Sequence, residues 1–441
     1  MPGIGLRWVA IVGMLLALSG CQVMDVESRP VRGSTEVHEW VVQEAGTGGL
    51  SDLWGRGTCQ PGAESEFRWI ECRSPGNGDP MLLASTQEFS PAVDVTGHSL
   101  HLWLHVDDPS KLGGLELRLA SENFDKGMAA FQIPLYTDLP FNMIQGGVWT
   151  PVSFSLGTAR IVGEVDLHNV SRVGLYAADN GTGPVRLGWT GLTAVEQAAE
   201  GYVSFTFDDG TLSHIEVAAP AMHEHRFRGT AYVMPDEVGD EGFVTTDHLD
   251  ELAGTYGWDV AAHHAVSFTH MKEGELEPAI LSVQSYLRKR GFDAGLGHLA
   301  YPLGRQDPKV VRPLVRKHFT TARLASAGPE TIPPADPHLL RAVNVLNTTT
   351  PEEIGAIALR AKQHGEWAIL MFHLLNDDPQ LEIAYAIDDF KKALQEVEKT
   401  GVKVLPVSEV WDRIGGIRTV RGDVRRGRGE ARGLASAPPS R

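Results

Sequence analysis

The chain has 441 residues and a net charge of −17, and 42% of its residues are hydrophobic. This globular composition excludes a largely disordered chain or a membrane bundle, and the length predicts two or three domains. The acidic balance argues against a nucleic-acid-binding protein, which would present a basic face. Three cysteines are too few for a disulfide scaffold or a zinc ribbon.

The N-terminus has the pattern of an export signal. The apolar run Trp8–Leu18 is too short to span a bilayer of about 30 Å as a helix. It ends in Leu18-Ser19-Gly20-Cys21, which resembles a bacterial lipobox and implies a signal peptide over 1–21 with lipidation of Cys21. An uncleaved or ordinary signal peptide is the alternative. We therefore expect a tether over 22–36 and a lipid anchor in the bacterial cell envelope, with Gln22 favouring the outer membrane or cell surface.

The segment 37–196 is predicted to form an antiparallel β-sandwich. Short runs in which apolar and polar residues alternate are separated by Gly, Asp, Asn and Pro, the pattern of antiparallel strands. The clearest runs are Ser99–Val106, Gly114–Leu119, Trp149–Leu156, Arg172–Tyr176 and Val185–Trp189. Many short strands without a long helix favour a sandwich or jelly roll. The segment is loosely similar to jelly-roll carbohydrate-binding modules.

Two sets of side chains in this segment suggest roles. Aromatic rings stack on sugars or pack in a core, so glycan binding and a structural or spacer role both stay open. The candidate rings are Trp54, Trp69, Trp103 and Trp149. Cys59 and Cys72 are disulfide candidates in an oxidising compartment, with two buried free thiols as the alternative.

The segment 200–415 alternates predicted strands and helices. Predicted buried strands are Tyr202–Phe207, Gly229–Met234, Trp258–Ala262, His298–Tyr301, Phe319–Leu324, Arg341–Val345, Trp367–Phe372 and Val402–Leu405. Predicted helices include His214–His225, Gly274–Arg290 and Ile383–Lys399. This alternation and length predict a parallel α/β barrel, in which the site is built at the carboxyl ends of the strands.

Reactive side chains follow the predicted strands at that end. Asp208 and Asp209 follow the first strand, His263 and His264 the third, and His373 the seventh. Adjacent carboxylates beyond a buried strand are costly unless they are paired or bind a cation. Carboxylate and imidazole at neighbouring strand ends suit Zn²⁺, with Co²⁺ or Ni²⁺ as alternatives. The sequence therefore predicts a divalent metal site that activates water for hydrolysis.

Three motifs carry a resemblance to a known family. They are Thr206-Phe207-Asp208-Asp209-Gly210, Ala300-Tyr301-Pro302-Leu303-Gly304 and Leu370-Met371-Phe372-His373. In content, order and spacing they resemble the polysaccharide deacetylases (NodB-like, carbohydrate esterase family 4). The resemblance covers about half of the chain and implies a distorted (β/α)₇ barrel.

The resemblance also implies a role for each matching residue. Asp208 would be the general base toward the attacking water, and Asp209 a metal ligand. The backbone N–H of Tyr301, which precedes Pro302, would stabilise the oxyanion of the tetrahedral intermediate. His373 would be the general acid that protonates the leaving amine.

The match is imperfect at the remaining positions. The family's second motif is usually His-x-x-x-His, but Ser267 stands four residues after His263. We expect His263 and His270 as ligands beside Asp209, with His264 as a contender. The Asp that orients the basic catalytic partner in the family's fourth motif has no clear counterpart, and Arg341 is the candidate to fill that region and steer the Asp208 carboxylate, with an ion pair to a helix acid as the alternative. The predicted helix after the aspartate pair carries histidines that we expect on the surface: His214, His223 and His225.

The function expected from these features is metal-dependent removal of N-acetyl groups from a cell-envelope or exported polysaccharide. An O-acetyl esterase on the same scaffold is the alternative within enzymes. A surface lipoprotein that binds glycans and has lost activity is the alternative outside them. The tail 416–441 holds seven arginines but only Asp423 and Glu430 as acidic residues, and we expect it to be disordered.

Overall fold

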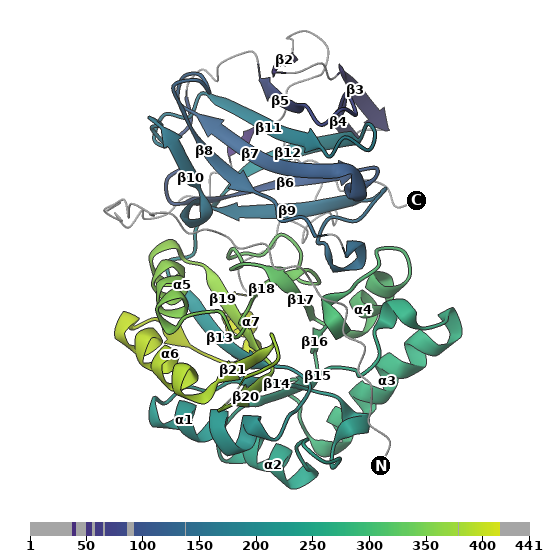
Figure 1. The fold of residues 1–441 in the computed structure, drawn as a ribbon, viewed down its shortest axis with the longest axis vertical. Coiled ribbons are helices and arrows are strands. Elements are labelled where there is room, and N and C mark those ends of the chain that lie inside the picture. The colour runs from purple at the N-terminus through teal and green to yellow at the C-terminus, as the bar shows by residue number, and fades with distance from the viewer. Residues whose placement is uncertain are drawn as a thin grey trace, which may run out of the picture. The chain divides into compact units, whose positions relative to one another are not determined.

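The structure is a computed structural model that describes residues 38–40, 50–54, 58–64, 67–85, 92–136, 138–377 and 379–414. The predicted lipobox, tether and basic tail lie outside the described residues. None of the helices in these ranges combines the length and the apolar composition needed to cross a bilayer. The elements fall into an all-β part followed by an α/β part (Figure 1), and the described residues of both belong to one compact unit.

The all-β part is built from two antiparallel sheets. Its strands are β1 (His38–Trp40), β2 (Leu50–Trp54), β3 (Thr58–Glu64), β4 (Phe67–Arg73), β5 (Pro80–Ser85), β6 (His98–Val106), β7 (Leu112–Ala120), β8 (Gly127–Gln132), β9 (Trp149–Ser155), β10 (Arg160–Gly163), β11 (Arg172–Asp179) and β12 (Arg186–Glu196). One sheet has the order β3-β4-β12-β6-β9, with β1 also paired to β12, and the other has the order β10-β8-β7-β11-β5-β2. Alternate residues such as Leu100, Leu102 and Leu104 face a core shared with Leu115, Leu117 and Leu119 of the second sheet.

The α/β part is a closed parallel barrel. Its elements are β13 (Tyr202–Phe207), α1 (Ala219–Glu224), β14 (Thr230–Val233), α2 (Thr246–Gly254), β15 (Asp259–Ala262), α3 (Glu273–Arg290), β16 (His298–Ala300), α4 (Val311–His318), β17 (Thr321–Ala327), β18 (Leu340–Asn344), α5 (Pro351–His364), β19 (Trp367–Phe372), β20 (Leu374–Asn376), β21 (Ala384–Ala386), α6 (Ile387–Thr400), β22 (Lys403–Val404) and α7 (Val407–Ile414). The sheet runs β14-β15-β16-β17-β18-β19-β13, and pairing of β13 with β14 closes the ring of seven strands. The predicted α/β barrel is confirmed.

Local sequence explains how these elements begin and end. Every residue of β13 is buried, as expected of a strand covered on both faces. Helix α5 begins with a capping box, in which the Thr350 hydroxyl accepts from the N–H of Glu353 and the Glu353 carboxylate accepts from the N–H of Thr350. It ends at Gly365, whose φ of 58° is left-handed.

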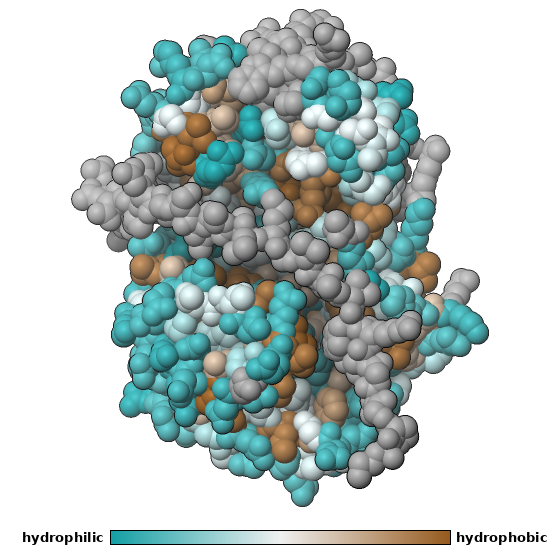
Figure 2. All heavy atoms as spheres, viewed as in Figure 1, coloured by the Kyte–Doolittle hydropathy of each residue, from teal (hydrophilic) through white to brown (hydrophobic). Residues whose placement is uncertain are grey.

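The helices turn their polar faces to the solvent. Figure 2 shows that hydrophilic residues dominate the visible surface of the barrel, with hydrophobic residues in smaller groups. Buried aromatic rings fill the space under the helices, where Phe205 and Phe372 stack at 5.8 Å between ring centroids. Packing of the helices on this apolar core holds the strands in place, and it therefore positions the strand ends.

One covalent feature of the sandwich agrees with the sequence. Cys72 is disulfide-bonded, and the backbone of Cys59 lies directly opposite it in the antiparallel pairing of β3 and β4. Cross-strand neighbours in such a ladder are about 5 Å apart at Cα, within the range that a disulfide bridges. The arrangement favours the predicted Cys59–Cys72 pairing.

Candidate active site

Polar side chains gather where the barrel strands end. Asp208 and Asp209 follow β13, and His373 follows β19. These strands are paired in parallel with Phe207 opposite Phe372, and the N–H of Asp208 donates to the carbonyl of Phe372 at 2.9 Å. Asp208 and His373 therefore leave neighbouring strands at the same height, as predicted from their positions at strand ends.

Asp209 and His263 form a pair across the barrel mouth. His263, which follows β15, places Nε2 at 3.3 Å from Oδ1 of Asp209, and its Nδ1–H donates to the carbonyl of Ala300 at 2.9 Å. The backbone bond fixes Nδ1 as a donor and leaves Nε2 facing the carboxylate. Asp209 itself has a φ of 73°, a left-handed conformation that is uncommon outside glycine and that turns its carboxylate toward His263.

The electrostatics of this pair favour a charged carboxylate. Burial alone would raise the pKa of Asp209, but the hydrogen bond and charge of His263 bring it down to about 2. For His263, burial opposes the charged form, but the hydrogen bond to Asp209 and the two nearby carboxylates raise its pKa overall. The site is thus organised around negative charge that a cation would balance.

The described residues fit a divalent metal at this pair but do not complete the expected ligand set. Asp209 and His263 offer a carboxylate oxygen and an imidazole nitrogen at a separation typical of adjacent ligands. Within the described ranges, no set of three or more His, Cys, Asp or Glu side chains is arranged to hold a metal. Among the described residues, the structure therefore places no third predicted ligand beside Asp209 and His263.

The spare histidines are engaged elsewhere. Nδ1 of His264 accepts from the N–H of Val266 at 2.9 Å. His270 is exposed, and its Nε2 lies 2.9 Å from Nη1 of Arg305. An arginine only donates, so this Nε2 lone pair is already used. The expected grouping of His270 or His264 with His263 is not found in the structure.

The arginine beside Asp208 is Arg323 of β17. Its Nη2 donates to Oδ1 of Asp208, and both side chains are almost fully buried. The guanidinium also lies over the ring of Tyr232, at 4.9 Å from the centroid. Arg323 was not among the predicted site residues, although an arginine within a predicted buried strand is a signal, because burial of an unpaired charge is costly.

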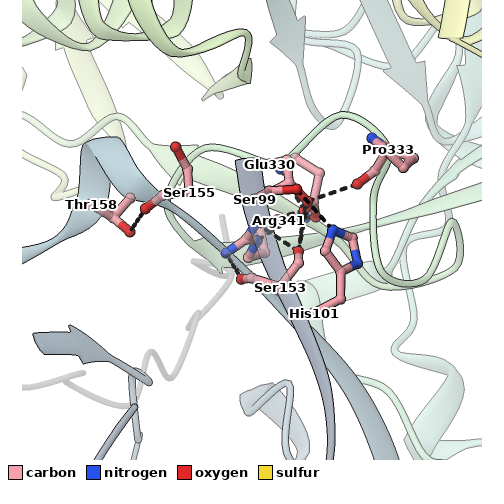
Figure 3. Close-up of polar contacts among 9 residues, drawn as sticks. Ser99, His101, Ser153, Ser155, Thr158, Glu330, Pro333 and Arg341 are labelled. Atoms are coloured by element: carbon pink, nitrogen blue, oxygen red, sulfur yellow. Dashed lines mark hydrogen bonds and ion pairs between the residues drawn. The ribbon is translucent and has the colours of Figure 1, made fainter. Parts of the chain in front are cut away.

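The prediction that Arg341 steers Asp208 is wrong. Arg341 on β18 pairs with Glu330, with 2.6 Å between Nη2 and Oε1, and its Nη1 donates to the carbonyl of Ser153 on β9 at 2.9 Å (Figure 3). It therefore has a structural ion pair, as in the alternative, although its partner Glu330 lies between β17 and β18 and not on a helix. Arg323 and Arg341 lie on adjacent strands, and the sequence does not show which of the two faces the barrel interior.

The backbone donor expected at Tyr301 is also placed differently. The N–H of Tyr301 donates to the carbonyl of Arg323 at 3.0 Å, because Tyr301 continues the pairing of β16 with β17. Pro302, which is buried, has no N–H. The next backbone donor is Leu303, which has a φ of 57° and is 53% exposed. The turn η7 (Pro302–Gly304) thus presents Leu303, not Tyr301, at the surface.

A residue expected on the surface lies behind the site. His214 begins the π-helical turn η4 (His214–Ala218), is fully buried, and donates from Nε2 to the carbonyl of His373 at 2.6 Å. Burial lowers its pKa to about 4, so it is neutral near pH 7. Nδ1 of His373 is buried and has no hydrogen-bond partner among the described residues. The backbone of His373 is therefore fixed by His214.

Three of the candidate tryptophans of the sandwich lie on one sheet, whereas Trp54 is on β2 of the other. Trp69, Trp103 and Trp149 are half-buried, on β4, β6 and β9, and the rings of Trp69 and Trp149 meet edge to face at 5.8 Å. The side chain of Trp54 lies outside the described residues. Stacking on glycan by these rings stays a prediction.

No family model matches the sequence, and no curated protein matches it. The solved structures similar to the chain include a family 4 acetyl xylan esterase from Clostridium thermocellum in complex with cobalt, at 15% identity over 48% of this chain and 92% of that one, with a TM-score of 0.35. A peptidoglycan deacetylase from Bacillus subtilis matches at 13% identity over 50% and 95%, with a TM-score of 0.33.

A further match is a family 11 carbohydrate-binding module of a Clostridium thermocellum cellulase, at 9% identity over 37% of this chain and 96% of that one, with a TM-score of 0.28. The solved structures similar to this chain thus include a family 4 acetyl xylan esterase, a peptidoglycan deacetylase and a family 11 carbohydrate-binding module.

Proposed function

We propose that the protein is a metal-dependent hydrolase that removes acetyl groups from a cell-envelope or exported polysaccharide, and that these are N-acetyl groups. The observation that carries the proposal is the convergence of Asp208, Asp209, His263 and His373 at the carboxyl ends of β13, β15 and β19 of one barrel. A carboxylate and an imidazole that do not pair with each other can act separately. One can serve as the general base and the other as the general acid, on opposite sides of a reacting carbonyl.

Asp209 and His263 are the residues that would hold the metal, for which Zn²⁺ is the first choice and Co²⁺ or Ni²⁺ the alternatives. When bound, such an ion polarises a carbonyl and lowers the pKa of water. The Nδ1–H bond of His263 to Ala300 keeps its Nε2 free for that purpose.

Asp208 would take the proton of the attacking water. Its contact with the Arg323 guanidinium holds one carboxylate oxygen, which leaves the other oxygen for the water. The burial of both groups fixes this geometry before substrate arrives.

His373 would give a proton to the leaving amine, since its Nδ1 is enclosed and only Nε2 remains for the reacting side. The N–H of Leu303 would donate to the developing oxyanion, because the N–H of Tyr301 is used within the sheet. The exposed Leu303 side chain adds an apolar surface at the mouth.

The test is release of acetate by the full chain from N-acetylglucosamine polymers and from O-acetylated glycans, with added Zn²⁺ or Co²⁺. We expect release by the wild type and none by Asp208→Asn, whose matched control is Asp236→Asn, an aspartate in an exposed turn. Release only from O-acetyl substrates would favour the esterase. Absence of release from every glycan, together with no bound metal, would leave a glycan-binding surface lipoprotein. We also propose the lipid anchor at Cys21, which radiolabelled-acyl incorporation in wild type and Cys21→Ser would test.

A further inference from the structure

The sandwich reaches the barrel on a side that lacks a helix. Strands β17 and β18 are joined by residues 328–339, which contain no helix, whereas α5 joins β18 to β19. Here the Glu330–Arg341 pair is closed by Ser153 of the sandwich, whose hydroxyl donates to Oε1 of Glu330 at 3.3 Å (Figure 3). Thr331 adds a bond from its hydroxyl to that of Ser153 at 2.7 Å. The buried contact ties the two parts together.

A second contact comes from a sandwich loop that precedes β9. This brace loop comprises residues 138–145 and includes the turn η2 (Leu139–Phe141). Asn142 stiffens it, because its Oδ1 accepts from the N–H of Tyr136 and its Nδ2 donates to the carbonyl of Tyr136, both at 2.7 Å. Nε2 of Gln145 donates to the carbonyls of Leu139 and Asn142. The brace loop therefore has a defined shape of its own.

The brace loop packs on the turn that carries Leu303. The N–H of Gln306 donates to the carbonyl of Pro140 at 2.9 Å, and its Nε2 donates to the carbonyl of Asn142 at 2.9 Å. A Cβ added at Gly304 would lie 2.8 Å from the Phe141 ring, so this ring packs closely against the backbone of Gly304. The sandwich is thus in direct contact with residues next to the proposed oxyanion donor.

An ion pair connects the brace loop to Arg305, which also contacts the loop that follows His263. Arg305 donates from Nε to Oδ2 of Asp138 at 2.8 Å, and its Nη2 lies 2.6 Å from the same oxygen. Its Nη1 points the other way, to Nε2 of His270 at 2.9 Å. The series Asp138, Arg305, His270 therefore links the sandwich to the loop that follows His263.

We propose that the brace loop is a positioning element of the active site, and that Asp138 is a positioning residue that acts through Arg305 on the turn at Leu303 and on the loop at His270. The sandwich then forms part of the catalytic unit and is not only a glycan-binding attachment. The proposal rests on the proposed function for its effect on rate, but its effect on loop order does not depend on any activity.

The experiment compares hydrogen–deuterium exchange in the full chain for wild type, Asp138→Asn and Asp138→Glu. The control is Asp94→Asn, the same change at another ion-paired aspartate of the sandwich, whose partner is His168. We expect Asp138→Asn to raise exchange in peptides 263–272 and 301–307 by roughly twofold to fivefold, the range that an ion pair of this exposure supplies. Asp138→Glu, which keeps the charge, should exchange more slowly than Asp138→Asn, and Asp94→Asn should match the wild type in these peptides.

Acetate release supplies the second readout. Asp138→Asn should lower kcat by a similar factor with KM within about twofold of wild type, because an ordered donor acts on the transition state. Equal exchange in wild type and Asp138→Asn would overturn the positioning role, whatever the activity. Faster exchange in a protein that releases acetate from no substrate would support the positioning role and reject the proposed function.

Discussion

Nε2 of His214 lies 2.6 Å from the carbonyl oxygen of His373, so a buried imidazole holds the backbone of the proposed general acid. The bond joins the turn after β13 to the end of β19. A second bond reinforces it, since the N–H of Leu375 donates to the Ser213 hydroxyl at 3.1 Å. His373 has no side-chain orienting partner among the described residues, so these backbone contacts set its position.

Replacement of His214 should therefore disturb His373 without touching substrate. His214→Phe removes the donor, and leaves a buried carbonyl unpaired at a cost of about 1–3 kcal/mol in stability. His214→Gln retains an N–H donor and should keep more of both stability and kcat. Thermal unfolding and acetate release measure the two effects, with the exposed His223→Gln as control. Equal kcat in His214→Phe and wild type would remove the positioning role.

The buried pair of Asp208 and Arg323 predicts a rescue of stability without a rescue of activity. Either Asp208→Asn or Arg323→Met leaves one buried group without its partner, which costs about 3–5 kcal/mol. The double variant removes both and should be more stable than the sum of the singles implies. All three variants should be inactive, since the base is lost or misdirected.

Urea unfolding of the four proteins gives the coupling energy. The control is Arg160→Gln, which removes an ion pair with Glu116 from a side chain that is 59% exposed, and should change stability by less than about 1 kcal/mol. Additive losses in the double variant would contradict the pairing.

Substitution of the four predicted ligands should change Zn²⁺ affinity to different extents. Asp209→Asn and His263→Gln should weaken Zn²⁺ binding by about tenfold or more, because both point to one place. His264→Gln and His270→Gln should stay within about twofold of wild type, since their bonded ring nitrogens are engaged with Val266 and Arg305. Equilibrium dialysis of the full chain measures all four. A tenfold loss in His270→Gln would restore it as the third ligand.

Buried neutral histidines predict sensitivity to acid. Burial lowers the pKa of His214 and His298 to about 4, and that of His101 to about 3. An unfolded histidine has a pKa of about 6.5, so the unfolded chain binds these protons first. Their stability contribution is therefore complete above about pH 6.5 and is lost as the pH falls toward 4.

Melting temperatures between pH 7.5 and 4.5 measure this dependence. His298→Asn should flatten the curve, because one proton fewer is taken up on unfolding, whereas the exposed His223→Gln should leave its slope unchanged. A melting temperature that does not fall across this range would contradict the assignment.

Much of the barrel was predictable because its strands are fully buried apolar runs. The bounds of β13 and β19 agree with the prediction, and the strand-end rule placed Asp208, Asp209, His263 and His373 together. Those inferences need only local pattern and one topological rule.

The remaining contacts depend on which side chains meet across the sheet. Arg323 and Arg341 have similar local sequence but opposite partners, Asp208 and Glu330. The burial of His214 follows from a bond to a residue far along the chain, and the N–H of Tyr301 is taken by the neighbouring strand. Such pairings are properties of the tertiary arrangement, so the sequence pattern does not contain them.

At Asp209 the left-handed backbone favours glycine, whereas the proposed metal site needs a carboxylate. Glycine adopts a φ of 73° at the least conformational cost, so a chain selected only to fold would be served by glycine there. Asp209→Gly should consequently relieve the backbone strain, although it also removes the carboxylate that pairs with His263, and it should lose metal. Aspartate at this position thus trades stability for activity, because it keeps a proposed metal ligand in place at the expense of a strained backbone.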